Sequence, residues 1–382
     1  MLTDRKIYGE YHEMFRESVR TFLRAELEPN IAEWEKIGKT PRSFWKQAGE
    51  QGFLCPAIPE EYGGPGADFL FNMIVDEEIG YAIGGGSVGF AAHSDMCAHY
   101  LLNRGTEEQK QAYLPAMVKG EKIAAIAMTE PGAGSDLKAI KATADRDGDH
   151  YVLNGQKTYI TNGQNADFFV LACKTDKEAG AKGISMLLVD ADLEGFSRGS
   201  NLDKIGQKAA DTSELFFDNV RVPADRLLGG EGQGFAIMME ELARERLSVA
   251  VRALAAATRA YDLTREYVTE RQAFGKQVWD FQNTKFVLAD IKTKLHVSWA
   301  YIDQCLEKVA EDRLGVDDGA MAKLWCSELE GEVVDACLQL FGGYGYMAEY
   351  PISRFYTDAR VRRIYGGTTE IMKSYISRFV HS

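Results

Sequence analysis

The sequence has no closely spaced cysteine pair and no long apolar run. Its six cysteines are scattered along the chain, at Cys55, Cys97, Cys173, Cys305, Cys326 and Cys337. Without a CxxC pair, a zinc site or a disulfide framework is disfavoured, and reduced thiols in a reducing compartment are expected. We therefore predict no metal. No apolar stretch approaches the roughly 20 residues that span a bilayer, so no membrane span is expected.

A positive charge excess is also lacking. The chain carries 44 Lys and Arg against 57 Asp and Glu, a net charge of −13, which argues against nonspecific nucleic-acid binding. There is no internal repeat and no low-complexity segment. The N-terminal segment is charged and amphipathic and has no apolar signal core. We expect the bacterial cytoplasm as the location, with the mitochondrial matrix as the alternative for a mature chain.

A length of 382 residues is too great for one compact core, so two or three domains are expected. Residues 1–122 show mostly helical patterns. Residues 123–232 contain short segments rich in Val, Ile, Phe, Tyr and Thr, which predict an antiparallel, barrel-like β domain with a hairpin at Asn154 and Gly155. Residues 233–382 are helical again and predict a four-helix bundle. The predicted fold is mostly α with a central antiparallel β domain.

The longest helical pattern covers residues 234–275 and includes an acid on its apolar stripe. Glu245 shares this stripe with five apolar residues, namely Met238, Leu242, Val249, Ala253 and Ala256. Burial raises the pKa of an unpaired carboxyl group, which suits it to act as a general base. The alternative is a structural glutamate paired with Arg244, Arg246 or a distant residue, since ion pairs also perturb pKa values.

Two motifs stand out elsewhere. The first is AMTEPGAGSD (residues 127–136), whose glycines allow close backbone approach to a ligand and whose N–H groups suit phosphate oxygens. A plain glycine-rich turn is the alternative. The second is QLFGGYGYMAEYPISRFYTDAR (residues 339–360), in which a helix end meets two glycines and then a series of charged residues. A helix C-cap followed by a salt-bridged helix is the alternative there.

Together these motifs resemble the paired signatures of the acyl-CoA dehydrogenase family, and both match without a gap. The resemblance extends to YGGPGAD (62–68), NGQKTYITNG (154–163), ERQAFGK (270–276) and IYGGTTEI (364–371), so it covers nearly the whole chain. It implies an N-terminal helical domain, a middle β domain and a C-terminal helical bundle, which agrees with the order read from the patterns alone.

The resemblance also implies FAD, held between the β domain and the bundle, with part of each site supplied by a neighbouring subunit. Thr161 is expected near flavin N5, the atom that receives hydride. The positions implied for cofactor binding are Ile126, Ala127, Met128, Thr129, Ser135, Tyr159, Ile160, Thr161, Arg271, Phe274, Gln282, Gln339, Gly342, Gly343, Thr368, Thr369 and Glu370. A homotetramer, built as a dimer of dimers, is the expected assembly.

The catalytic base departs from the pattern of most short- and medium-chain members of the family. These place a glutamate directly before Gly-Thr, where this chain has Gly366. That difference indicates either an inactive protein or a base supplied from elsewhere. The long-chain and isovaleryl branches place the base on the first bundle helix, which corresponds to Glu245, and three further segments look closer to the long-chain type. Glu370 is a rival in a flavin-contact position, whereas Glu240 and Glu241 lie off the apolar stripe.

The activity implied is the dehydrogenation of a medium-chain, long-chain or branched fatty acyl-CoA to trans-2-enoyl-CoA in fatty acid β-oxidation. Glu245 would remove the α-proton, the Gly366 N–H would bind the thioester oxygen, and the β-hydride would pass to flavin. Substrate contacts are expected at Ser135, Ala243, Arg244, Arg246 and Gly367. Electrons would then pass to an electron-transfer flavoprotein. The alternatives are an oxidase of the same fold that uses O₂ and a non-catalytic acyl-CoA or flavin-binding scaffold.

Overall fold

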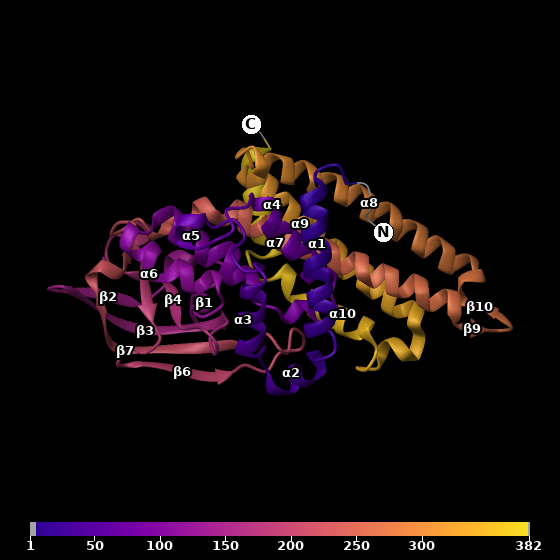
Figure 1. The fold of residues 1–382 in the computed structure, drawn as a ribbon, viewed down its shortest axis with the longest axis horizontal. Coiled ribbons are helices and arrows are strands. Elements are labelled where there is room, and N and C mark those ends of the chain that lie inside the picture. The colour runs from indigo at the N-terminus through magenta and orange to yellow at the C-terminus, as the bar shows by residue number, and fades with distance from the viewer. Residues whose placement is uncertain (1–4, 381–382) are drawn as a thin grey trace.

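The computed structural model describes residues 5–380, so residues 1–4 of the predicted N-terminal helical region and residues 381–382 lie outside it. The molecule is elongated, with the β-sheet at one end, the N-terminal helices in the middle and the long C-terminal helices at the other end (Figure 1). The predicted order of helical, β and helical parts is confirmed. Within residues 5–380, no helix has both the length and the apolar character needed to cross a membrane.

The N-terminal part consists of short helices. They are α1 (Glu10–Phe22), α2 (Ile31–Ile37), α3 (Arg42–Glu50), α4 (Phe69–Tyr81), α5 (Ala98–Arg104) and α6 (Glu107–Val118). A π-helical turn, Ala92–Cys97, leads directly into α5. Helix α6 begins with a capping box, since the Gln109 N–H donates to Thr106 Oγ1 and the Thr106 N–H donates to Gln109 Oε1. These two bonds fix where α6 begins.

The β part forms one sheet. Its strands are β1 (Ala124–Ala127), β2 (Thr143–Asp147), β3 (His150–Thr161), β4 (Phe168–Lys174), β5 (Ile184–Asp190), β6 (Phe196–Asn201), β7 (Thr212–Pro223) and β8 (Leu227–Leu228). The order is β6-β7-β3-β2-β4-β5-β8, and β1 pairs with β4. The pairing is antiparallel apart from β1 with β4 and one contact of β2 with β4, which are parallel.

The predicted hairpin at Asn154 and Gly155 is wrong. Both residues lie inside β3, which turns back on β2 at Gly148 and Asp149 instead. Gly155 has a φ of +143° and sits where the register of β3 against β7 shifts, and a Cβ there would meet Ala142 Cα at 2.7 Å. The Asn-Gly pair therefore forms a β-bulge, because a bulge favours the same residues as a tight turn.

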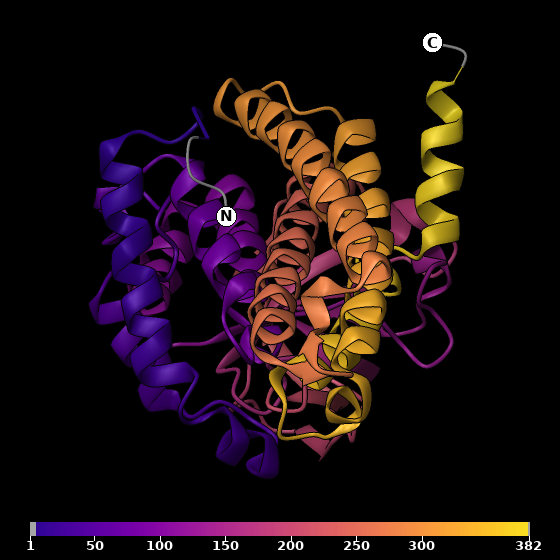
Figure 2. The same ribbon diagram turned by 90° about the vertical axis from the view of Figure 1, so that its right-hand side faces the viewer.

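The C-terminal part contains three long helices that run side by side, α7 (Gly234–Glu270), α8 (Gln282–Ala310) and α9 (Val316–Phe341) (Figure 2). The small hairpin of β9 (Gln272–Ala273) and β10 (Lys276–Gln277) joins α7 to α8 at the far tip of the molecule. The predicted fourth helix is short: α11 (Thr369–Ile376) follows α10 (Pro351–Ala359) and packs against α9.

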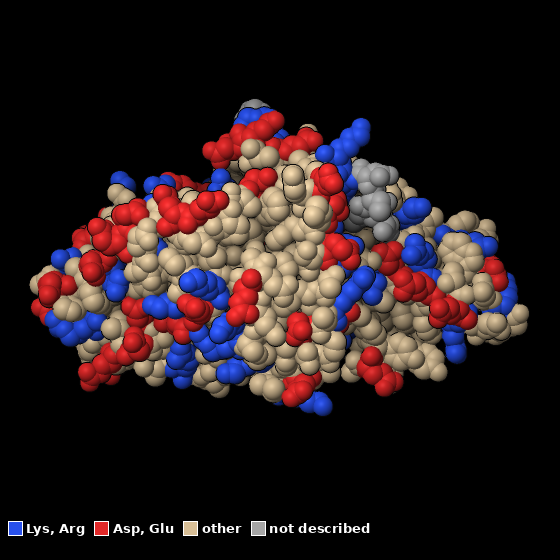
Figure 3. All heavy atoms as spheres, in the orientation of Figure 1, with Lys and Arg blue, Asp and Glu red and all other residues tan. Residues whose placement is uncertain are grey.

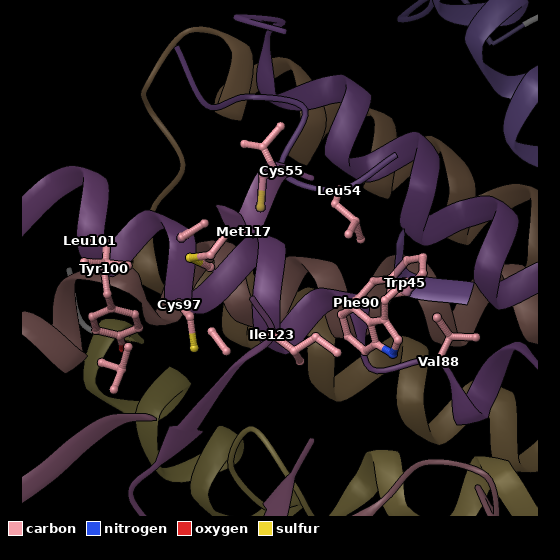
Figure 4. Close-up of a cluster of buried hydrophobic side chains, with 14 of the residues drawn as sticks. Trp45, Leu54, Cys55, Val88, Phe90, Cys97, Tyr100, Leu101, Met117 and Ile123 are labelled. Carbon is pink, nitrogen blue, oxygen red and sulfur yellow. The ribbon is translucent and has the colours of Figure 1, made fainter. Parts of the chain in front are cut away.

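Helix α7 connects two hydrophobic cores. Met238 packs with the core of the N-terminal helices and the sheet, part of which is drawn in Figure 4, whereas Leu247 packs with the core of the long helices. All residues from Glu245 to Thr258 are buried, so the helix is enclosed on every side there rather than on one stripe. Burying each such leucine or valine contributes about 1.5–3 kcal/mol. Glu245 therefore lies between two well-packed cores.

Charged side chains lie mainly around the margins of the face seen in Figure 3, where acidic and basic groups are interspersed. The six cysteines are all free and buried, in agreement with the prediction of reduced thiols.

Candidate active site

Glu245 is held in the interior by α7. Its side chain is 8% exposed, and Oε1 accepts a hydrogen bond from Tyr100 Oη at 3.0 Å. Tyr100 is fully buried and belongs to α5, in the core region of Figure 4. Burial raises the pKa of Glu245 to about 7; the tyrosine hydrogen bond works against this rise, and the nearby Glu241 carboxylate adds to it. The site thus contains a carboxyl group poised near neutral pH.

Neither neighbouring arginine forms an ion pair with Glu245. Arg244 pairs with Asp312 at 3.0 Å, and its guanidinium also lies near the Phe69 ring. Arg246 is buried, lies over the Tyr375 ring, and leaves Nε and Nη1 without a hydrogen-bond partner. Within residues 5–380, no cation lies at salt-bridge distance from Glu245. Glu245 is therefore not the structural, ion-paired glutamate of the alternative interpretation.

Gly366 and Gly367, here called the glycine turn, precede α11, and Gly366 lies beside α7. Both have left-handed backbones, with φ of +64° and +97°. A Cβ at Gly366 would contact only Val249 Cγ2, at 3.8 Å. Val249 lies four residues after Glu245 and so on the same helix face. Gly366 therefore lies close to the face of α7 that carries Glu245.

The rival acid, Glu370, has a different environment. It is exposed in the first turn of α11, where a hydrogen bond from its own backbone N–H and one from the Thr368 hydroxyl lower its pKa. Thr368 caps the same helix through the Ile371 N–H, and Thr369 Oγ1 donates to Glu328 Oε1. A lowered pKa makes Glu370 the weaker base of the two acids.

The segments predicted to line the flavin ring lie together at the ends of β1 and β3. Lys157 Nζ donates to the Met128 carbonyl at 2.9 Å and to Glu130 Oε1 at 2.8 Å, and the Thr158 N–H donates to the Thr129 carbonyl. These contacts join residues 128–130 to residues 157–158, which directly precede residues 159–161 in β3. Tyr159 is 68% exposed with a φ of +59°, at a second register shift of β3. A strained, exposed aromatic residue of this kind is typical of a ligand-binding edge.

The remaining cofactor positions lie at the opposite end of the long helices. Arg271 follows the last residue of α7, and its guanidinium lies 5.3 Å from the centre of the Tyr344 ring. Phe274, at the tip of the β9-β10 hairpin, is 95% exposed. The others are also exposed, namely Gln282, Gln339, Gly342 and Gly343. At 1.5 Å per residue, Arg271 lies about 40 Å from Glu245 along α7. Arg271 and Glu245 therefore lie far apart on the same chain.

Two buried side chains at this site were missed by the sequence reasoning. Tyr100 lies in a predicted helix, but nothing in the sequence connects it to an acid 145 residues away. Lys323 is fully buried on α9 and donates a hydrogen bond to the carbonyl of Gly367. Its position among Ala320, Ala322 and Cys326 on an apolar helix was the available signal. Glu241, which was predicted to lie off the apolar stripe, is also buried. Its Oε1 accepts a hydrogen bond from Asn103 Nδ2 at 2.7 Å.

Comparison with known proteins gives consistent matches along the chain. Three family models match: the acyl-CoA dehydrogenase N-terminal domain over residues 9–121, the middle domain over 125–220 and the C-terminal domain over 232–381. The long-chain specific acyl-CoA dehydrogenase, mitochondrial, of Mus musculus is 46% identical over 386 residues, covering 100% of this chain and 90% of that protein.

Solved structures of acyl-CoA dehydrogenases also match this chain. An acyl-CoA dehydrogenase from Geobacillus kaustophilus has a TM-score of 0.96 at 48% identity and covers 99% of this chain and 100% of its own. An acyl-CoA dehydrogenase from Bacillus anthracis, complexed with FAD, has a TM-score of 0.92 at 31% identity, with 100% of this chain and 68% of that chain covered. From these matches and the geometry above, the chain belongs to the acyl-CoA dehydrogenase family.

Proposed function

We propose that this enzyme oxidises a fatty acyl-CoA to the trans-2-enoyl-CoA and that Glu245 removes the α-proton. The observation that carries the proposal is the environment of Glu245, which is buried, has no ion-pair partner within residues 5–380, and has a pKa of about 7. A base with a pKa near the working pH is ionised in about half of the molecules and accepts a proton readily. The inactive-scaffold alternative is disfavoured, because the base missing at Gly366 has a replacement beside the same space.

FAD is the cofactor, as in the solved relative from Bacillus anthracis. When bound, it supplies the acceptor for the β-hydride of the substrate. The residues of the loop after β1 fit such a group. A Cβ at Gly132 or Gly134 would meet no atom within 4 Å, and within residues 5–380 the N–H groups of Gly132, Gly134 and Ser135 donate no hydrogen bond. Open backbone donors of this kind suit the polar atoms of a flavin or a phosphate.

The glycine turn is the proposed site of thioester activation. The Gly366 N–H donates no hydrogen bond within the described part of the chain, so it is available to the thioester oxygen. Negative charge develops on that oxygen as Glu245 takes the α-proton, and a fixed donor stabilises it. Burial of Glu245 between two cores also keeps water away from the reacting atoms.

Further substrate contacts are proposed at residues on both sides of the base. Arg246 has two unpartnered guanidinium nitrogens, which are costly to bury unless a ligand accepts from them. The other proposed contacts are Ser135, Ala243, Arg244 and Gly367. The acyl chain is proposed to be medium, long or branched, and it would run along residues 88–104, which include the small residues Ala91, Ala92 and Ala98.

The separation of the two sets of cofactor positions along α7 supports a second copy of the chain in each site. We propose a dimer that completes two FAD sites and a tetramer built from two such dimers. The proposed electron acceptor is an electron-transfer flavoprotein, and the proposed location is the bacterial cytoplasm, or the mitochondrial matrix for a mature chain.

Anaerobic titration with acyl-CoAs of different length and branching tests the reaction. We expect flavin absorbance to bleach and one trans-2-enoyl-CoA to form per flavin reduced. Failure of every acyl-CoA in the panel to bleach the flavin would favour the scaffold. The bleached enzyme is then mixed with O₂ or with electron-transfer flavoprotein: reoxidation only by the flavoprotein supports a dehydrogenase, and rapid reoxidation by O₂ would identify an oxidase.

A further inference from the structure

Lys323 is a buried cation without a carboxylate partner. It is 0% exposed, and within the described residues no acid lies at salt-bridge distance from its Nζ. Its hydrogen bond goes to the carbonyl oxygen of Gly367. Burial, followed by the nearby Arg246 cation, lowers its pKa to about 8. An apolar side chain would fill this position at a lower desolvation cost, so the ammonium group points to a role beyond packing.

The segment that Lys323 contacts needs an external restraint. Two consecutive glycines have the greatest backbone freedom of any pair of residues, and neither has a side chain to anchor it. Other bonds hold only the flanks of the glycine turn: Arg363 Nη1 pairs with Glu328 at 3.2 Å, and Thr369 also donates to Glu328. Within residues 5–380, the only side-chain hydrogen bond to either glycine of the turn is the one that Lys323 donates to the Gly367 carbonyl.

The glycine turn has free backbone donors close to α7. The N–H groups of Gly366 and Gly367 donate no hydrogen bond within the described chain, and the missing Cβ of Gly366 points towards Val249, one turn from Glu245. The backbone carbonyl held by Lys323 lies in the peptide that follows Gly367, so a bond to it limits rotation of the pair. Such preorganisation determines how well a backbone donor stabilises developing charge.

We propose that Lys323 is a positioning residue, which holds the glycine turn so that the Gly366 N–H meets the thioester oxygen of acyl-CoA. The proposal rests on the proposed function, because both assign the thioester oxygen as the ligand of the Gly366 N–H. Lys323 touches neither reacting carbon and acts through Gly367. Losing one oxyanion donor lowers rates by about 10²–10³, so a misplaced donor should lower them by about 10- to 100-fold.

The test compares Lys323→Met, which keeps the length and removes the donor, with wild type. Lys308→Met is the matched control, since Lys308 lies in the same bundle and pairs with Asp318 at 2.7 Å. The probe is a 3-thia-acyl-CoA, which loses its α-proton but has no β-carbon hydride to transfer, and its enolate gives a long-wavelength charge-transfer band with oxidised flavin. The pH at which half of the bound probe is ionised measures how strongly the thioester oxygen is stabilised.

We expect Lys323→Met to raise that pH by about one unit or more, a tenfold weaker ionisation. Flavin reduction at saturating acyl-CoA should slow by 10- to 100-fold, with a smaller change in the probe's Kd, whereas Lys308→Met should change none of these values. If Lys323→Met does not load FAD, Lys323→Leu, which also lacks a donor, replaces it. FAD-loaded Lys323→Met that ionises the probe as wild type does would overturn the proposal, whatever its melting temperature. A wild-type enzyme that no acyl-CoA reduces would instead contradict the proposed function.

Discussion

The phenolic oxygen of Tyr100 lies 3.0 Å from Oε1 of Glu245, and both side chains are buried. The bond joins α5 to α7. It favours the ionised carboxylate, while burial favours the neutral acid, and burial is the larger effect. The balance leaves the pKa of Glu245 at about 7 rather than at its usual value of 4.5.

This balance predicts the pH dependence of the wild-type enzyme. If Glu245 is the base, kcat/KM should rise about tenfold per pH unit below pH 7 and level off above it, because only the ionised form accepts the α-proton. Stopped-flow flavin reduction under anaerobic conditions, between pH 5 and 9, measures it. A pH profile of kcat/KM with its midpoint near pH 4.5 would exclude a buried base.

Removing the tyrosine hydroxyl should shift the midpoint of this pH profile. In Tyr100→Phe the hydrogen bond that lowers the Glu245 pKa is lost, so the midpoint should shift to higher pH and activity at pH 7 should fall. Tyr113→Phe is the control, because Tyr113 is also buried but donates to Asp190, far along the chain from Glu245. An unchanged midpoint in Tyr100→Phe would mean that the bond is absent in the working enzyme.

Glu245→Gln should keep FAD and the fold but slow flavin reduction by about 10³-fold or more, since Gln accepts no proton. Its stability should be no lower than that of wild type at pH 8. The folded-state pKa lies above the usual value, so ionisation of Glu245 costs stability progressively from about pH 4.5 to 7 and fully above 7, and Gln removes this cost.

Glu241→Gln, also on α7 and buried, is the matched control and should retain most activity. Rapid flavin reduction by Glu245→Gln would show that another residue is the base.

Moving the acid across the site should restore part of the activity. In the double variant Glu245→Gly with Gly366→Glu, the new side chain would leave the turn beside Val249, where it has room. The gain is limited, because φ of +64° costs a non-glycine residue about 1–3 kcal/mol. Glu245→Gly with Gly366→Ala carries the same strain without the acid. Equal flavin reduction by the two double variants would mean that the positions do not share one substrate carbon.

Lys157→Met should destabilise the β part. Glu130 would keep two backbone donors, Lys141 N–H and Ala142 N–H, but lose its buried cation, and breaking a buried ion pair costs about 3 kcal/mol or more. The urea midpoint should fall and FAD should dissociate more easily. Lys177→Met, which breaks the exposed pair with Asp145, should change stability by less than about 1 kcal/mol. Equal effects of the two variants would contradict this account.

Much of the fold was predictable from local patterns. The limits of α7 follow from apolar periodicity, and its end at Glu270 lies a few residues before the predicted end at residue 275. In contrast, Asn154 and Gly155 were assigned to a turn, because the sequence does not reveal that β3 has partners on both sides, β2 and β7.

For the site, local sequence patterns were enough to identify the acid on an apolar helix, the glycine at position 366 where the resemblance implies an acid, and the glycine-rich segments that resemble the family's signatures. The packing of the whole chain shows that Tyr100, not an arginine, is the partner of Glu245, that Lys323 donates to the Gly367 carbonyl, and that Arg271 lies about 40 Å from Glu245 along α7. Periodicity and turn preferences act over a few residues, whereas these relationships join segments far apart in sequence and arise only when the whole chain packs.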